Sequence, residues 1–189
     1  LTVTGGARRF DYDKTVSGAV TIGNVISNSP VTAFSQVDAS AKGWVQRVNV
    51  NYEFSKSIMA YAQASKGFRP GGANNIPGLT TGLVAFAPDS LWNYEAGVKT
   101  QLFDNKVRWN SSVFYMKYRD LQVQQTSGAC LCNIINNASS ATIKGVESEL
   151  LYSPMSRVQL SLSGTYLSPK YDLFIDTNGT NNTGKILQR

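Results

Sequence analysis

Few residues of this 189-residue sequence have the types and spacing that catalysis needs. Glu147 and Glu149 stand two positions apart, and paired carboxylates can share acid–base work. The sequence contains no histidine, which removes the commonest general base and the commonest metal ligand. Cys130 and Cys132 supply two thiols, too few for a zinc site. The segment is therefore predicted to hold no catalytic residue, no metal site and no cofactor, and not to be an enzyme.

The charge distribution bears on possible partners. The formal net charge is +6, and the only adjacent basic pair is Arg8-Arg9. Basic stripes with interleaved aromatic residues, which are typical of nucleic-acid binding, do not occur. We expect no nucleic-acid partner, although a basic segment could attract anionic ligands or lipopolysaccharide phosphates.

The segments that contain these residues are predicted to be strands. Side chains alternate between two faces along a strand. Between positions 91 and 103 one face carries Trp92, Tyr94, Ala96, Val98, Thr100 and Leu102, and the other carries Asn93, Glu95, Gly97, Lys99 and Gln101. Similar alternation predicts seven strands, at 1–10, 42–54, 57–68, 90–103, 106–125, 140–153 and 157–168. Phe114 interrupts the pattern, and strand 57–68 leaves open whether Ala60 or Tyr61 faces outward.

The connections alternate between short and long. Short turns are expected at 55–56, 104–105 and 154–156, where Ser, Asp, Asn and Pro favour hairpins. Long connections rich in Gly, Asn, Ser and Thr are expected at 11–41, 69–89, 126–139 and 169–189. An up-and-down antiparallel sheet with tight turns at one rim and large loops at the other explains this alternation.

The apolar face could contact lipid or, in a soluble β-sandwich, a protein core. Strands of about 9–11 residues are long enough to cross a bilayer, and aromatic residues near both strand ends resemble interfacial girdles. A charge on the lipid face near the bilayer centre costs about 2–4 kcal/mol, and the mid-strand apolar faces carry none. Lipid contact is predicted for Trp92, Val98, Leu160 and Leu162, and lumen-facing positions for Arg47, Glu95, Lys99, Glu147 and Glu149. Lys117 and Arg119 are predicted to lie above the lipid.

No apolar run of about 18 residues occurs, so no transmembrane helix is predicted. Outer-membrane barrels have short periplasmic turns and long extracellular loops, which places the four long connections outside the cell. About seven strands are expected to be part of a larger barrel, cut at both ends from a longer chain. The fold class is therefore all-β, a partial antiparallel transmembrane β-barrel.

Five segments resemble the C-terminal barrel of TonB-dependent outer-membrane receptors. They are AYAQASKGFRPGG at 60–72, LWNYEAGVK at 91–99, FDNKV at 103–107, VFYMKYRDLQ at 113–122 and KGVESEL at 144–150. They occur in the order of the family and at hairpin spacing, from about 42 to 168. Residues 1–41 fit a preceding strand and loop.

The resemblance implies a barrel of about 22 strands closed by a plug domain. It implies an outer-membrane protein of Gram-negative bacteria that imports a scarce nutrient, most often a ferric siderophore, with energy from TonB. Residues 1–189 are expected to be barrel alone, so the plug and the TonB contact lie outside this chain. Lipid and lipopolysaccharide are the expected surroundings. Haem, vitamin B12 and oligosaccharides stay open as ligands, and a passive pore, an adhesin or a secreted β-sandwich is the alternative.

Within this resemblance, the loop at 69–89 is the candidate ligand-binding segment. Arg69 could pair with an anionic chelate, and Asn74 and Asn75 could donate hydrogen bonds to it. The alternative is that Arg69 braces the loop and the asparagines only form turns. Glu147 and Glu149 are expected to bond to Arg47, Lys99, Arg108 or the plug, which favours structural over catalytic carboxylates.

Overall fold

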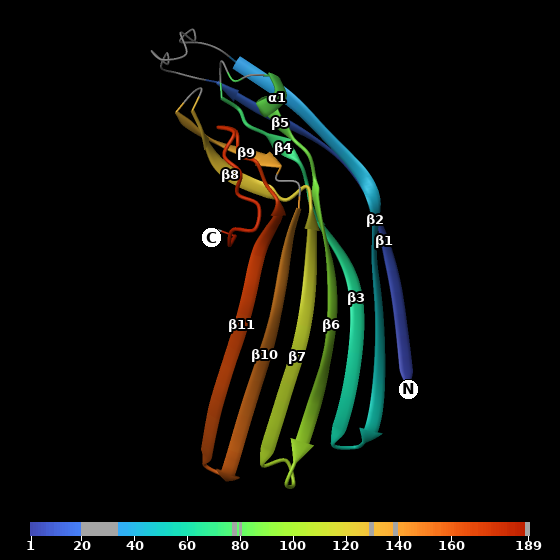
Figure 1. The fold of residues 1–189 in the computed structure, drawn as a ribbon. Helices are drawn as coiled ribbons and strands as arrows, with labels where there is room; N and C mark the ends of the chain where they lie inside the picture. The colour runs from blue at the N-terminus through green and yellow to red at the C-terminus, as the bar shows by residue number, and fades with distance from the viewer. Residues whose placement is uncertain (20–33, 77–78, 80, 129–130, 138–139, 188–189) are drawn as a thin grey trace.

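The computed structural model describes all residues except 20–33, 77–78, 80, 129–130, 138–139 and 188–189. Its main feature is one antiparallel sheet of seven long strands (Figure 1). The strands are β1 (Thr2–Ala19), β2 (Phe34–Ser55), β3 (Ile58–Arg69), β6 (Asp89–Leu102), β7 (Val107–Arg119), β10 (Ser140–Met155) and β11 (Val158–Leu173). Each strand pairs with the next long strand along the chain. This confirms the predicted up-and-down fragment of a barrel, which these seven strands do not close.

The smaller elements gather at one end of the sheet, opposite the short turns (Figure 1). They are β4 (Gly72–Ala73), α1 (Thr81–Val84), β5 (Ala85–Phe86), β8 (Gln122–Ser127) and β9 (Cys132–Asn137). Strand β4 pairs with β5, and β8 pairs with β9, so that each pair forms a separate two-stranded sheet. Helix α1 has four residues, and no helix in the described residues is long and apolar enough to cross a membrane.

The strand register divides the sheet into an apolar and a polar face. One register row on the apolar face runs Ala62, Ala96, Val113, Val146 and Tyr166 across five strands. From this row down to the row of Ile58, Thr100, Trp109, Leu150 and Leu162, these strands carry no charged residue on that face. The side chains of Leu160 and Leu162 are 57% and 70% exposed. Their contact with lipid stays a prediction, as it does for the half-buried Trp92 and Val98 on the same face.

Hydrogen bonds join neighbouring strands on the polar face. Glu95 accepts bonds from the Tyr61 hydroxyl at 2.6 Å and from Gln63 Nε2 at 2.9 Å. Arg47 Nη2 donates to Gln63 Oε1 at 3.1 Å, and Lys99 Nζ lies 5.5 Å from the centre of the Tyr61 ring. Tyr61 therefore lies on the polar face, which resolves the ambiguity of its strand and places Ala60 on the apolar face.

Two aromatic rings on the polar face lie over glycines of adjacent strands. A Cβ atom on Gly97 would lie 2.7 Å from the Tyr61 ring, and one on Gly145 would lie 2.4 Å from the Phe114 ring. Glycine leaves room for a ring to cross the neighbouring strand, and such cross-strand pairs help to fix the register. Phe114 interrupts the sequence alternation because it fills this place beside Gly145 and not a place on the apolar face.

Several predicted boundaries were wrong. The strand expected at 157–168 continues to Leu173, and the connection expected at 126–139 contains β9. The strand expected at 106–125 ends at Arg119, because Asp120 adopts a left-handed φ of 54° and the chain turns into the separate hairpin β8–β9. The connection expected at 11–41 is strand as far as Ala19 and again from Phe34. Val37, Ala39 and Ala41 alternate with Asp38 and Ser40, a short period-two signal that the prediction did not use. Across the ribbon, Thr15 Oγ1 donates to Asp38 Oδ1 at 2.7 Å.

Candidate ligand-binding site

A cavity of about 980 Å³ opens where the strands meet the loops. Its lining includes Arg69 at the end of β3, Tyr118 at the end of β7, residues 122–126 of β8, and Phe174 and Lys185 beyond β11. Strand ends and loops therefore contribute together, an arrangement in which a rigid sheet positions variable binding residues.

The apolar part of the cavity wall belongs to the small core at this end. Leu121, Ala141, Tyr171 and Phe174 form a buried cluster, and Tyr118 packs against it. The rings of Tyr171 and Phe174 lie 4.7 Å apart between centroids. The break after β7 turns Leu121 into this cluster, so the same feature that ends the strand supports the cavity.

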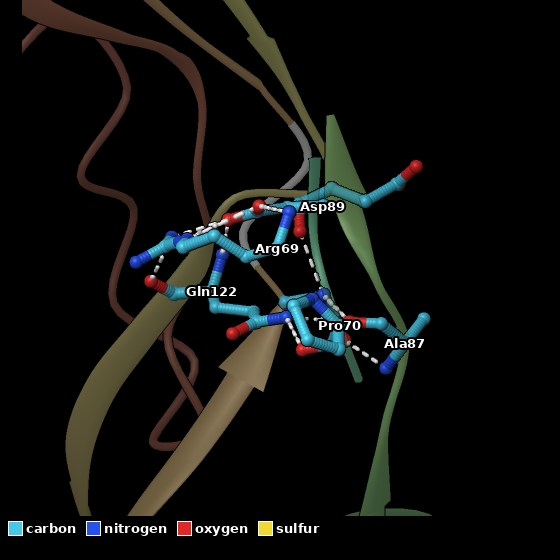
Figure 2. A network of polar contacts seen from close by, with 7 residues as sticks. Arg69, Pro70, Ala87, Asp89 and Gln122 are labelled. Atoms are coloured by element: carbon cyan, nitrogen blue, oxygen red, sulfur yellow. Dashed lines mark hydrogen bonds and ion pairs between the residues drawn. The ribbon is translucent and has the colours of Figure 1, made fainter. Parts of the chain in front are cut away.

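Arg69 and Asp89 form an ion pair at the cavity edge (Figure 2). Arg69 Nε donates to both carboxylate oxygens, at 2.8 and 3.1 Å, and Nη2 also contacts Asp89. Asp89 is 2% exposed, whereas the Arg69 side chain is 53% exposed. The hydrogen bonds to Asp89 raise the pKa of Arg69 above its ordinary value, so the guanidinium stays charged. A buried carboxylate is thereby neutralised by a cation that still reaches the cavity.

Gln122 hydrogen-bonds to the two chain segments that carry this ion pair, 69–70 and 87–89 (Figure 2). Its backbone N–H donates to Asp89 Oδ2 at 3.1 Å, and its carbonyl accepts from Arg69 Nη2 at 3.2 Å. Its side chain donates to the carbonyls of Pro70 at 2.9 Å and Ala87 at 3.1 Å. The start of hairpin β8–β9 is therefore fixed to both ends of the loop between β3 and β6.

Two asparagines fasten the other strand of the hairpin. Asn74 Nδ2 donates to the carbonyls of Leu83 and Ile135, each at 2.7 Å, and Asn74 Oδ1 accepts from Ile135 N–H at 2.8 Å. Asn137 exchanges bonds with Ala87, accepting from its N–H at 2.8 Å and donating to its carbonyl at 3.0 Å. Amide side chains can satisfy both backbone groups of a residue in this way.

The segment after β11 forms the opposite wall. Asp176 Oδ1 accepts from the N–H groups of Thr180 at 2.9 Å and Asn178 at 3.0 Å. These bonds, that from Thr180 foremost, lower the pKa of Asp176 below its ordinary value. Asn178 in turn accepts from Gly128 N–H at 3.1 Å, which ties this wall to the hairpin. Lys185 Nζ donates to Asn182 Oδ1 at 3.0 Å.

The predicted ligand residues differ in where they lie. Arg69 lines the cavity and also braces the loop, so both readings of its role apply to one side chain. Asn74 and Asn75 do not line it, and Asn74 uses its amide within the fold. The binding of ligand by these three residues stays a prediction. Cys132 is disulfide-bonded, and Cys130, the other cysteine of the sequence, lies outside the described residues.

The carboxylates of β10 lie on the polar face, but not opposite cations. Glu147 faces Ser112 and accepts from its hydroxyl at 3.2 Å, and Glu149 faces Asn110. The expected ion pairs with Arg47, Lys99 or Arg108 do not form, since Arg69–Asp89 is the only ion pair among the described residues. The register places neutral polar residues of β7 and β11 beside both carboxylates, which explains the difference.

Sequence reasoning missed the aromatic and basic residues of the cavity. Tyr118 had a usable signal, because it continues the even-numbered polar face of Arg108, Asn110 and Ser112. Tyr171, Phe174 and Lys185 lie at or beyond the end of the alternating pattern, in a stretch expected to be loop. Together with Arg69, these residues offer cationic and aromatic surface, and the same lining also holds the carboxylates of Asp89 and Asp176.

Known proteins share this architecture. A family model described as "TonB dependent receptor-like, beta-barrel" matches residues 1–189. The pesticin receptor of Yersinia pestis is 29% identical over 147 residues, covering 77% of this chain and 20% of the receptor. The metal-pseudopaline receptor CntO of Pseudomonas aeruginosa is 29% identical over 120 residues, covering 64% of this chain and 16% of the receptor.

Solved structures agree on the fold. The ferric yersiniabactin uptake receptor FyuA from Yersinia pestis superposes with a TM-score of 0.70 at 21% identity, covering 89% of this chain and 24% of that one. The chain thus spans no more than about a quarter of the length of these three proteins.

Proposed function

Since this chain belongs to the TonB-dependent receptor β-barrel family, we propose that it forms one part of the wall of a receptor that imports a metal chelate. The family consists of outer-membrane receptors and not of enzymes. The proposed location is the outer membrane of a Gram-negative bacterium, with the short turns in the periplasm and the cavity towards the outside.

The observation that carries the proposal is the division of the sheet into two faces below a cavity. The apolar face presents about 27 Å of strand between Leu102 and Tyr94, at about 3.4 Å per residue, close to the band of about 25 Å that a barrel offers to lipid. The polar face carries the bonded network around Glu95. A membrane receptor wall needs both faces and a binding site above them.

The proposed ligand is an anionic chelate, with a ferric siderophore as the leading candidate. Arg69 and Lys185 bring positive charge to the cavity, while the Asp89 and Asp176 carboxylates already accept hydrogen bonds from the protein. Receptors similar to this chain are named for ferric yersiniabactin, metal-pseudopaline and pesticin. Aromatic rings of Tyr118 and Phe174 would contact the apolar parts of such a ligand.

We also propose that the plug and the contact with TonB belong to other parts of the full-length protein. Lumen-facing groups of this segment, such as Arg47, Lys99 and Glu149, would then face the plug. Energy-coupled import follows from that arrangement, whereas a passive pore or adhesin needs no coupling.

Uptake of radiolabelled ferric chelates by cells that carry the full-length receptor tests this function. Arg69→Ala and Lys185→Ala are each expected to weaken binding by about tenfold, the loss expected for a charge-assisted hydrogen bond. Arg157→Ala, in the turn at the opposite rim, serves as the matched control and should leave binding unchanged. Unchanged uptake in both cavity variants would remove the proposed site.

Dissipation of the proton gradient tests energy coupling separately. An uncoupler is expected to stop uptake and to leave surface binding intact. Uptake that continues with the uncoupler would favour a passive pore. Binding without uptake under any condition would favour an adhesin.

A further inference from the structure

Three lysines form a triangle on the apolar face at the end nearest the loops. Lys117 of β7 and Lys170 of β11 both face Thr142 of β10, one from each side. Lys144 lies two residues further along β10 on the same face, as a diagonal neighbour of both at about 7–8 Å between Cα atoms. Its Nζ lies 5.6 Å from the centre of the Tyr115 ring. We call Lys117, Lys144 and Lys170 the lysine triangle.

The surrounding charges leave the triangle strongly positive. Arg119 lies on the same face, two residues beyond Lys117, and Lys66 lies in the register row of Lys117, across Trp92. The nearby carboxylate of Asp172 accepts a hydrogen bond from Thr142 Oγ1 at 2.7 Å. None of these cations forms an ion pair within the described residues. Close like charges repel one another, so an anion between them would be bound favourably.

The position of the triangle identifies the kind of anion. Tyr94 and Tyr115 lie in the register row of Lys144, and the rows below, through Ala96 to Thr100, carry no charge. Cations followed by aromatic residues and then by an uncharged apolar surface match headgroups, interface and acyl chains of a membrane. A free phosphate would not need the apolar surface that continues below.

We infer that the lysine triangle binds the phosphates of a phosphorylated glycolipid in the outer leaflet, with its acyl chains on the apolar face below. The inference rests on the proposed function, because the loops must face the outside for this rim to meet the outer leaflet. At the opposite rim the cations Lys56, Lys106 and Arg157 stand in three separate turns.

Lipid binding to the purified full-length receptor tests the inference. Native mass spectrometry would titrate the receptor in detergent with diphosphoryl lipid A and, separately, with phosphatidylglycerol. The variant Lys117→Gln/Lys144→Gln/Lys170→Gln is expected to bind lipid A at least about tenfold more weakly, since each lysine near an anionic surface contributes to affinity. Lys106→Gln is the matched control and should bind like the parent protein. Phosphatidylglycerol should bind the parent at least about tenfold more weakly than lipid A.

Equal lipid A binding by the triple variant and its parent would overturn the inference. Equal binding of both lipids by the parent would also overturn it, because the triangle would then be a general cationic patch that binds any anionic lipid. The electrophoretic shift between heated and unheated protein checks that the variant folds. If the triple variant does not fold, lipid A binding is measured for Lys170→Gln alone and for the parent at increasing salt concentration. Lipid A affinity that changes neither with this substitution nor with salt would reject the site. Failure of the proposed function is distinct, because it is measured by chelate uptake in Arg69→Ala and Lys185→Ala, and neither residue belongs to the lysine triangle.

Discussion

Asp89 carries a formal charge at a position where 2% of its side chain is exposed. Such a group is tolerated only when it is paired and hydrogen-bonded. Arg69 and the backbone N–H of Gln122 supply these partners, and each belongs to a different segment around the cavity. The ion pair therefore acts as a positioning device for hairpin β8–β9 and not only as a local contact.

Removal of the cation alone is predicted to destabilise this end of the sheet. Arg69→Met leaves the buried carboxylate unpaired and should lower the free energy of local unfolding by about 1–3 kcal/mol, less than for a fully buried pair because Arg69 is half exposed. Limited proteolysis of the β8–β9 hairpin in the full-length protein would measure this. The double variant Arg69→Met/Asp89→Asn should recover part of the loss, because no unpaired charge remains and the amide oxygen can still accept from the backbone N–H of Gln122. A double variant cleaved faster than Arg69→Met would contradict the account.

Asp176 is predicted to make the stability of the C-terminal wall of the cavity depend on pH. Hydrogen bonds from Thr180 and Asn178 lower its pKa in the folded loop relative to the ordinary value of 3.8. A depressed pKa means that the stabilisation is fully present above about pH 4 and is lost as pH falls through the lowered pKa. Amide exchange protection at Thr180 should therefore fall below pH 4. Asp176→Asn should show weaker protection at neutral pH and no such fall, and an identical fall in this variant would contradict the assignment.

At the scale of elements, strands were predictable where apolar and polar residues alternate between the two faces. The strands containing Glu95 and Leu162 alternate between apolar and polar residues, so their existence and direction could be read from the sequence. In the upper part of the β1–β2 ribbon the alternation of Val37, Ala39 and Ala41 with Asp38 and Ser40 is short, and the prediction did not use it. The hairpin β8–β9 has polar residues on both faces, and period-two alternation gives no signal there. The cavity residues beyond β11 were missed for the same reason.

The ring of Phe114 over Gly145 shows that the register also depends on single residues. A Cβ atom at Gly145 would lie 2.4 Å from the Phe114 ring and 2.7 Å from the carbonyl oxygen of Tyr166. The ring can rotate away, but the backbone oxygen belongs to a paired strand and moves only if the pairing of β10 with β11 shifts. Gly145→Ala is predicted to lower the unfolding free energy by about 1–3 kcal/mol through overpacking.

A matched control exists on the adjacent strand. A Cβ atom at Gly164 of β11 would meet nothing within 4 Å, so Gly164→Ala should leave stability nearly unchanged. Urea unfolding of the full-length receptor in detergent would compare the two variants. Equal stability of both would show that Phe114 and Tyr166 adapt without cost.

At the scale of the whole molecule, the sheet ends at β1 on one side and at β11 on the other. The loop-side end of β11 pairs with residues 184–187, for example through an antiparallel bridge between Lys170 and Ile186, and no further long strand pairs with either edge in the described residues. Unpaired edges invite association with other strands, and barrels remove them by closure. Because each long strand pairs with its neighbour in sequence, further strands of the full-length protein can extend both edges without any rearrangement of these seven. The seven strands thus already have the two different faces and the two different rims that the proposed receptor wall needs.

This polarity predicts which rim meets the outside of the cell. Thr180 lies exposed in the segment after β11, and Asn105 lies exposed in the turn between β6 and β7, at opposite ends of the sheet. In intact cells that express the full-length protein, a membrane-impermeant maleimide should label Thr180→Cys and should label Asn105→Cys only after lysis. Cys132 is disulfide-bonded and should not react, so the parent protein gives the background. Labelling of Asn105→Cys alone in intact cells would reverse the orientation, and the cavity could then not receive a ligand from outside.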